Sequence, residues 1–384
     1  MKNVGTQLFQ LVGMLCEWKS FIVHVKFIYI TAFRASNTNS TGCLILSGKS
    51  LYYMLTKRIL TAFDFFSCGG GASLGIIQAG FNLLGFNEID ERMAKIHQDN
   101  IKTTFDYVCD IRDMLNMSLP QELYNLDLAH FSPPCSTFSM VGLREKVWGK
   151  EKKFAEGQKK QKLDELLFVA IDMIAKLKPK VATIENVMGL IKGRAKIEYF
   201  DKAITQLQNI GYEVEYCVLN ATTFDVPQNR ERVFIIAQRK DIFKHYVRIQ
   251  NKPKIIPFST IMDDDRNANI PERLYYLWKS RISTDKSIED ILVRMGKKRN
   301  DFSKKLQQRD KTLCTLTTHS NDVILYDIPR YLTINERIKA STFPVDYKFP
   351  RYTLNSVSYI TGHCIPPKMM AGIAKQIREV VFYV

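Results

Sequence analysis

The chain lacks the cysteine spacing of a zinc-binding or disulfide-rich protein. Its eight cysteines are scattered over 384 residues, and no two of them form a C-x-x-C pair. Structural zinc sites depend on such pairs, and disulfide frameworks are typical of short secreted chains. We therefore expect no metal site, and we expect the free thiols of a protein in a reducing, cytoplasmic compartment.

Long apolar runs are also missing. The stretch Phe21–Phe33 is apolar, but it has only 13 residues and contains His24 and Lys26. A membrane-spanning helix needs about 20 residues. No well-placed small residues mark a cleavage site for a signal peptide. The sequence thus predicts neither a membrane span nor a secretion signal.

Residues 1–58 differ from the rest of the chain, and we assign them no function. Residues 35–50 are rich in Ser, Thr, Asn and Gly, which is typical of a linker. Met54 supports a second interpretation, in which translation begins there and the preceding residues are not part of the native protein. Both interpretations of this N-terminal extension stay open.

Acidic residues are few compared with basic ones. The 39 Asp and Glu stand against 55 Lys and Arg, a net charge of +16. This excess favours nucleic acid as a partner over the alternative of a merely basic soluble protein. Residues 144–162 hold eight basic and three acidic side chains (net +5), and residues 292–311 hold eight and two (net +6). Each stretch either contacts phosphates or forms a solvated loop.

Apolar strands alternate with amphipathic helices between Leu60 and Arg239. The expected strands are 59–67, 81–90, 127–132, 181–187, 212–220 and 232–238, and the expected helices are 71–80 and 162–177. This alternation predicts an α/β fold with a mostly parallel, doubly wound sheet. Such sheets bind ligands at the carboxyl ends of their strands, where the polar clusters of this chain lie.

The periodicity weakens after Gln238 and returns near Arg330. We expect a first, cofactor-binding domain at residues 59–240 and a smaller mixed domain at residues 241–329. Residues 330–384 are expected to return to the first domain.

A glycine turn follows the first predicted strand, with the sequence DFFSCGGG at residues 64–71. Such a turn lets the backbone approach a ligand closely. Glu88 ends the second strand and can accept hydrogen bonds from ribose hydroxyls. Asp110, near the end of a third strand, can accept one from an adenine amino group. Nicotinamide, flavin and S-adenosylmethionine proteins all use such turns, and some turns serve packing alone.

Three further polar clusters carry reactive groups. Two prolines hold Cys135 in a fixed loop, where it is either a nucleophile of lowered pKa or an inert buried thiol. Glu185, in the sequence IENV, either donates a proton to a heteroaromatic ring or caps a helix. Arg230 and Arg232 alternate, so their side chains are expected to point the same way. They suit phosphate, a base carbonyl or surface salt bridges.

The order of these motifs resembles that of the cytosine-5 DNA methyltransferase family, of the prokaryotic and viral restriction-modification type. The matching elements are DFFSCGGG at 64–71, Pro134-Cys135, ENV at 185–187, QNRER at 228–232, RYLTINE at 330–336 with Phe343-Pro344, and GHCIPP at 362–367. The resemblance implies a doubly wound, Rossmann-like fold that depends on S-adenosylmethionine, with a target-recognition domain in the variable region.

The resemblance also implies roles for the reactive groups. Cys135 would add as a thiolate to carbon 6 of cytosine, and Glu185 would protonate ring nitrogen 3. Arg232 would hold the base carbonyl oxygen, and Arg230 would help to position the loop and the base. Because a base inside a duplex is out of reach, the target cytosine would be flipped out of the stack.

For the methyl donor, the resemblance implies eight binding residues, which are Phe66, Gly70, Gly71, Glu88, Asp110, Ile111, Pro134 and Leu166. The chain departs from the family pattern at two places around this site. Cys68 stands where most members have glycine, and His363 stands where asparagine is usual. Both departures concern the donor pocket rather than the reacting groups.

The implied partners are double-stranded DNA and a cognate restriction endonuclease, with the enzyme itself a monomer that binds no membrane. Methylation of transfer RNA and a non-catalytic, DNA-binding role are the alternatives within the family. A nicotinamide-dependent oxidoreductase would share the glycine turn. It would not explain the Pro-Cys loop or the Q-x-R-x-R element.

Overall fold

The computed structural model describes residues 58–135, 138, 148–151, 162–243, 245–264, 270–297, 304–350 and 352–382. Residues Ile59–Val384 form one compact unit, which contains every element described below. The predictions for residues 1–57, and those for most of the basic stretch 144–162, lie outside the described residues.

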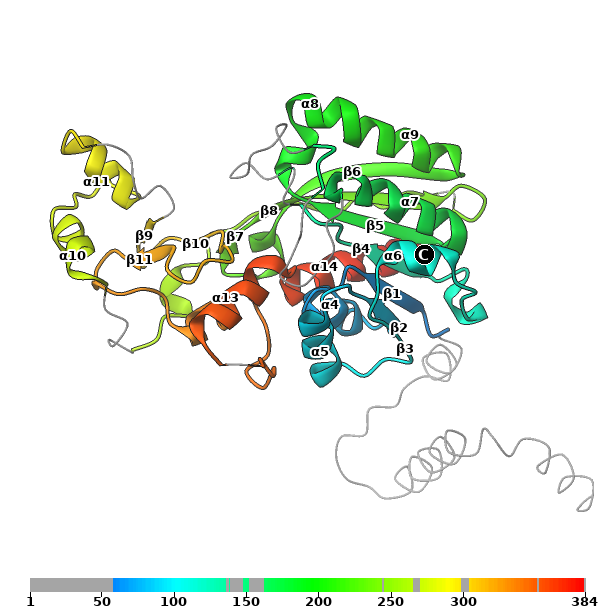
Figure 1. Ribbon diagram of the computed structural model, residues 1–384, viewed down its shortest axis with the longest axis horizontal. Helices are drawn as coiled ribbons and strands as arrows, with labels where there is room; N and C mark the ends of the chain where they lie inside the picture. Colours follow the sequence, from blue (N-terminus) through cyan, green and yellow to red (C-terminus); the bar gives the residue numbers. More distant parts are fainter. Residues whose placement is uncertain are drawn as a thin grey trace, which may run out of the picture. The chain divides into compact units, whose positions relative to one another are not determined.

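A seven-stranded sheet with the order β3-β2-β1-β4-β5-β8-β6 forms the centre of this unit (Figure 1). Its strands are β1 (Thr61–Phe65), β2 (Asn82–Asn87), β3 (Phe105–Tyr107), β4 (Leu128–Phe131), β5 (Val181–Asn186), β6 (Tyr212–Asn220) and β8 (Glu231–Arg239). Only β8 runs antiparallel to its neighbours β5 and β6. The predicted fold class, a mostly parallel α/β sheet, is therefore confirmed.

Helices cover both faces of the sheet, so strands such as β5 are buried along their whole length. The flanking helices are α4 (Gly71–Gln78), α5 (Glu91–Asn100), α6 (Ile111–Asn116), α7 (Leu166–Leu177), α8 (Gly193–Ala195), α9 (Asp201–Asn209) and α14 (Pro367–Ile377). One apolar core lies under α6, α7 and α9. A second core lies under α4 and α14.

Local signals explain where several of these elements begin. Asp90 caps α5 by accepting a hydrogen bond from the Arg92 amide at 2.9 Å. Asp110 caps α6 in the same way, through the Arg112 amide at 2.9 Å. Asp110 thus lies three residues after the end of β3, near the strand end as the sequence predicted, and it begins α6. The helix expected at 162–177 begins with a 3-10 turn at Leu163–Glu165.

The variable region contains α10 (Glu272–Lys279), α11 (Ile288–Arg294), β9 (Lys305–Gln307), β10 (Leu313–Cys314) and β11 (Val323–Leu325). Trp278 and Ile288 belong to a third apolar core, which is separate from the two cores that cover the sheet. Strand β10 pairs in parallel with β7 (Gln228–Asn229), directly before β8. The domain boundaries at 240/241 and 329/330 stay predictions.

The C-terminal segment contains α12 (Ile334–Ala340), α13 (Leu354–His363) and α14. Arg330 and Glu336 form an ion pair with both side chains 0% exposed. The Arg330 guanidinium donates to both carboxylate oxygens, at 2.7 and 2.9 Å. Glu336 also accepts the Thr333 amide in a capping box that begins α12. This buried pair explains the RYLTINE sequence in structural terms.

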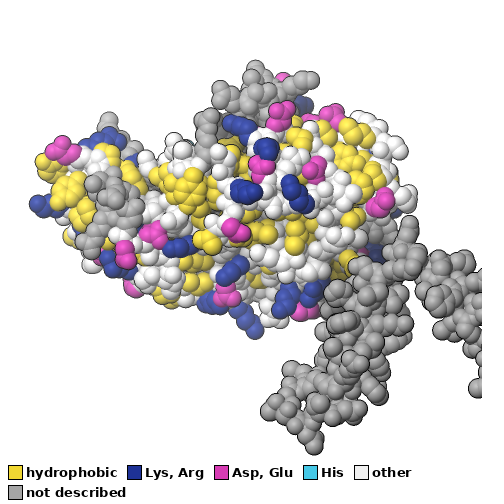
Figure 2. Space-filling model, turned by 90° about the horizontal axis from the view of Figure 1, so that it is seen from below, with side chains coloured by type: hydrophobic (Ala, Val, Ile, Leu, Met, Phe, Trp, Pro, Cys, Tyr) yellow, Lys and Arg dark blue, Asp and Glu magenta, His cyan; other side chains and the backbone are white. Residues whose placement is uncertain are grey.

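Two surface properties bear on partners. In the described part of the chain, no helix is long and apolar enough to cross a membrane. On the face shown in Figure 2, Lys and Arg side chains are interspersed with Asp and Glu. That face therefore does not show where a polyanion would bind.

Candidate active site

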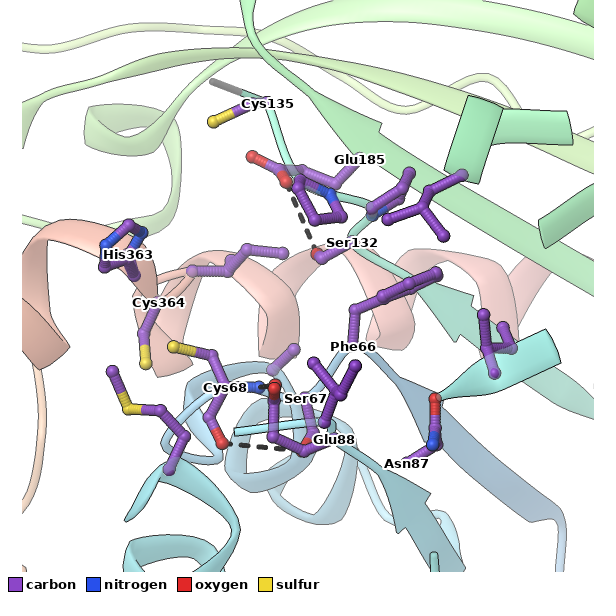
Figure 3. Close-up of a pocket in the computed structure, with 18 of the residues that line it drawn as sticks. Phe66, Ser67, Cys68, Asn87, Glu88, Ser132, Cys135, Glu185, His363 and Cys364 are labelled. Atoms are coloured by element: carbon purple, nitrogen blue, oxygen red, sulfur yellow. Dashed lines mark hydrogen bonds between the residues drawn. The ribbon is translucent and has the colours of Figure 1, made fainter. Parts of the chain in front are cut away.

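A pocket lies at the carboxyl ends of β1, β2, β4 and β5, where a doubly wound sheet is expected to bind ligands (Figure 3). It has about 920 Å³ of space not filled by protein atoms, part of it open to solvent. Residues 66–68, 87–89, 109–111 and 132–135 line it from the strand ends. Ala72, Met93, Leu166, Glu185 and residues 363–365 also line it.

Cys135 lies at one end of this pocket, in the loop after β4. Burial raises the pKa of its thiol above the usual range, and the charge of Glu185 raises it further. The charges of Arg232 and Arg230 oppose this shift without cancelling it. The resting thiol is therefore protonated at neutral pH, and it needs activation before it can act as a nucleophile.

Glu185 and Arg232 meet beside Cys135. The Arg232 Nε atom lies 3.0 Å from Glu185 Oε1, and the two side chains are 14% and 11% exposed. The other carboxylate oxygen, Oε2, accepts a hydrogen bond from Ser132 Oγ at 3.3 Å. Both carboxylate oxygens thus have a partner, which fixes the orientation of Glu185.

The glycine turn after β1 is held by Glu88. The Cys68 amide donates to Glu88 Oε2 at 2.7 Å, and the Asp90 amide donates to Oε1 at 2.8 Å. Burial is the main cause that raises the pKa of Glu88 to about 7. Cys68 adopts a left-handed conformation with φ of +50°, which costs a non-glycine residue free energy.

Comparison with known proteins identifies the fold and the family. The sequence model of the C-5 cytosine-specific DNA methylases matches residues 60–379. The chain belongs to this family. It is accordingly a DNA cytosine-5 methyltransferase, with S-adenosylmethionine as its methyl donor.

Two curated relatives are similar to most of the chain. The Type II methyltransferase M.Bsp6I of Bacillus sp. (strain RFL6) is 26% identical over 320 residues, which cover 80% of this chain and 95% of the relative. The Type II methyltransferase M.AplI of Arthrospira platensis is 26% identical over 334 residues, which cover 83% and 86%.

Two solved structures share the fold. The Dnmt2 methyltransferase of S. pombe matches with a TM-score of 0.58 and 15% identity, over 85% of this chain and 100% of that one. The methyltransferase EhMeth of Entamoeba histolytica matches with a TM-score of 0.57 and 16% identity, over 84% and 99%.

The residues that line the pocket of this methyltransferase fit its methyl donor in chemistry. Phe66, Ile111 and Leu166 supply apolar surface that suits an adenine ring. Glu88 supplies a buried carboxylate that suits ribose hydroxyls. Asp110 also lines the pocket, and it already accepts hydrogen bonds from the Arg112 amide and guanidinium.

Gly70 and Gly71 do not line the pocket, although the sequence placed them with the donor-binding residues. A Cβ atom on Gly71 would lie 2.3 Å from the Ile365 carbonyl oxygen. Gly70 has φ of +84°, and a Cβ there would lie 3.0 Å from Tyr347 Oη. Both glycines thus allow the turn to pack closely against the C-terminal segment.

Arg230 and Arg232 make different contacts, although the charges of both act on Cys135. The sequence predicted that their side chains point the same way. Arg230 is 2% exposed and precedes β8. It donates to the carbonyl oxygens of Gly362 at 3.1 Å and Leu316 at 3.5 Å. Arg230 therefore joins the end of α13 to the variable region. Among the described contacts, only Arg232 pairs with Glu185.

Two residues of the site carry no recognisable sequence signal. Ser132 and Asn87 both line the pocket. Asn87 donates to the carbonyl oxygens of Tyr107 and Cys109 at 3.1 and 2.9 Å, and so joins the ends of β2 and β3. Cys364, from the GHCIPP element, lies beside Cys68 in the same pocket. Hydrogen bonding with Cys364, and then burial, raises the pKa of Cys68.

Proposed function

We propose that the enzyme methylates carbon 5 of a cytosine flipped out of double-stranded DNA, at a specific sequence, through a covalent bond between Cys135 Sγ and carbon 6 of the base. The observation that carries this proposal is one pocket in which Cys135 and Glu185 adjoin the surface suited to the methyl donor. Arg232 pairs with Glu185 at this place. The nucleophile, the acid and the donor therefore share one cavity.

The residue set follows from the chemistry of cytosine. Carbon 5 is a weak nucleophile until a thiolate adds to carbon 6 and makes the ring an enamine. Glu185, as an acid, gives its proton to ring nitrogen 3 and so favours this addition. Arg232 holds the carbonyl oxygen of the base. Bound S-adenosylmethionine supplies the methyl group. Loss of the carbon-5 proton to a base then lets Cys135 leave as a thiolate, and return of the nitrogen-3 proton to Glu185 gives the neutral aromatic product.

The raised pKa of Cys135 makes activation part of the binding event. Activation transfers the thiol proton to a base, and the positive charges of Arg232 and Arg230 stabilise the thiolate that remains. The free enzyme thus keeps an unreactive thiol, and the nucleophile forms beside its substrate.

For the methyl donor, we propose that Phe66, Ile111 and Leu166 cover the adenine and that Glu88 accepts from the ribose. Asp110 would lie at the adenine edge. Pro134 would lie beside the reacting carbon. Gly70 and Gly71 would act through the packing of the turn.

The cellular role we propose is that of a restriction-modification methyltransferase. The support is the Type II designation of the relatives M.Bsp6I and M.AplI. Such an enzyme would act as a cytoplasmic monomer on DNA, beside a cognate endonuclease that it need not contact. Methylation of transfer RNA is the alternative substrate within the family.

The test is to incubate the protein with labelled S-adenosylmethionine and either unmethylated DNA or transfer RNA, and to map the DNA product by bisulfite sequencing. The proposal predicts label in DNA at cytosines of one recurring sequence. Label in transfer RNA alone would select the alternative substrate. No label in either would overturn the proposed activity.

A further inference from the structure

A buried chain of hydrogen bonds leads away from Glu185, and the proposed mechanism does not use it. Ser132 Oγ, which donates to Glu185 Oε2, lies 3.0 Å from His130 Nε2. His130 Nδ1 in turn lies 2.8 Å from Thr183 Oγ1. Figure 3 shows the first of these hydrogen bonds, from Ser132 to Glu185 in the pocket. His130 and Thr183 are both 0% exposed.

Strand register brings these four side chains together. His130 of β4 lies directly opposite Thr183 of β5 in the parallel pair. Side chains two residues apart share a face of a strand. His130 and Ser132 therefore point the same way, as do Thr183 and Glu185. The chain runs along the sheet face covered by α4 and α14 and ends at the pocket.

The protons of this chain can be placed by elimination when Glu185 is a carboxylate. The hydroxyl of Ser132 has one proton, which it donates to Glu185. Ser132 must then accept from His130, so the proton of the neutral imidazole lies on Nε2. His130 Nδ1 accepts from the Thr183 hydroxyl. Burial lowers the pKa of His130 to about 3, so the ring is neutral at any working pH.

The same chain fits the acid form of Glu185 once the carboxylate has taken a proton from the pocket. The protonated Oε2 then donates to Ser132 Oγ, which has two lone pairs and still accepts from His130 Nε2. The Ser132 hydroxyl proton turns toward the pocket, which Ser132 lines. His130 and Thr183 keep their protons, so the carboxyl group alone gains one.

We propose that His130, Ser132 and Thr183 are positioning residues, which hold Glu185 in one place both as a carboxylate and as an acid. This inference rests on the proposed role of Glu185 as the proton donor to the base. A group that cycles between two protonation states needs a partner that accepts from one and donates to the other. A fixed donor would favour the carboxylate alone.

Several charged groups face Glu185 besides this chain. Arg232 pairs with it from β8, and the charges of Glu185, Arg230 and Cys135 act on one another. His130 approaches it from β4 through Ser132. Arg232 stabilises only the carboxylate, so the Ser132 hydroxyl, held in place by His130 and Thr183, is the contact that can stabilise the acid.

The experiment compares Ser132→Ala, Thr183→Val and the parent enzyme by kcat, by the two KM values and by the pH profile of kcat. Ser358→Ala is the matched control, because Ser358 is also a buried serine but donates to the Leu354 carbonyl in α13. Thermal melts report whether each variant folds.

We expect Ser132→Ala to lower kcat about 10-fold to 100-fold, the cost of a hydrogen bond to a charged group, with both KM values unchanged. The alkaline limb of its pH profile should move to higher pH, because the carboxylate form loses the stronger bond. Thr183→Val, one link further away, should lower kcat by about 3-fold to 10-fold. Ser358→Ala should leave both kcat and the profile unchanged.

A folded Ser132→Ala enzyme with the parent's kcat and pH profile would overturn the proposal. So would a lower kcat with an unmoved profile, which is the mark of a purely structural role. Glu185→Gln separates this failure from that of the proposed mechanism. If Glu185→Gln keeps full activity, the role of Glu185 itself is wrong. If it is inactive while Ser132→Ala is unchanged, only the positioning chain is wrong.

Discussion

Arg232 Nε and Glu185 Oε1 lie 3.0 Å apart on adjacent strands, so the two groups proposed to hold the base already hold each other. Register in the antiparallel pair of β5 and β8 brings them together, since Glu185 lies opposite Phe234, two residues from Arg232. The pair keeps both side chains oriented before a base arrives. Base binding then exchanges part of this contact for contacts with the substrate.

Removing Arg232 should therefore affect chemistry more than folding. We expect Arg232→Ala to lower the single-turnover rate by at least about 10-fold to 100-fold, because Glu185 and the base lose a charged partner. Arg232→Lys should restore little, because an ammonium cannot replace the planar guanidinium. Arg239→Ala, at the far end of β8, is the control and should keep the parent's rate. A full rate in Arg232→Ala would remove Arg232 from the site.

Arg230 should behave in the opposite way. Its contacts are the backbone carbonyls of Gly362 and Leu316, and its side chain is buried. We expect Arg230→Ala to lower the free energy of unfolding by about 1.5–3 kcal/mol, the range for hydrogen bonds to a charged group. Urea denaturation measures this loss. Unchanged stability with lost activity would instead assign Arg230 to the reaction.

The ion pair between Arg330 and Glu336 should be a main determinant of stability. Glu336→Gln leaves a fully buried guanidinium without its carboxylate, which costs about 3–5 kcal/mol. Glu198→Gln breaks the ion pair with Arg194, whose side chain is 59% exposed, and it should leave the urea midpoint unchanged. Equal midpoints for both variants would show that the buried pair does not stabilise the fold.

Glu88 should make donor binding depend on pH. Its pKa of about 7 means that the carboxylate, which accepts from ribose hydroxyls, predominates only above that pH. Affinity for S-adenosylmethionine, measured by calorimetry, should therefore fall as the pH is lowered from 8 to 6.

Glu88→Gln should bind the donor about 10-fold to 100-fold more weakly and lose this dependence. The pKa of Asp64 is also raised to about 7, mainly by burial. Asp64→Asn is therefore the control, and its affinity for the donor should still fall between pH 8 and 6. If the pH dependence of donor affinity persists in Glu88→Gln and vanishes in Asp64→Asn, it arises from Asp64 and not from Glu88.

The sequence predicted the fold class, because strand and helix alternation is a local signal. It also predicted that Cys135, Glu185 and Glu88 lie at one edge of the sheet, because each follows or ends a predicted strand. It did not predict the roles of Arg230 or of the Arg330–Glu336 pair, because their partners are set by tertiary packing. The chain from Thr183 to Glu185 was equally hidden. Its members are ordinary core residues until the register of β4 and β5 places them in contact.

The measurement that tests the central claim most directly is peptide mapping of a trapped complex. Duplex DNA with 5-fluorocytosine at the methylated position lacks the carbon-5 proton whose loss releases the enzyme. With S-adenosylmethionine present, the account predicts a covalent complex whose modified peptide carries the base on Cys135. An adduct on another residue, or efficient methyl transfer by Cys135→Ser, would contradict it.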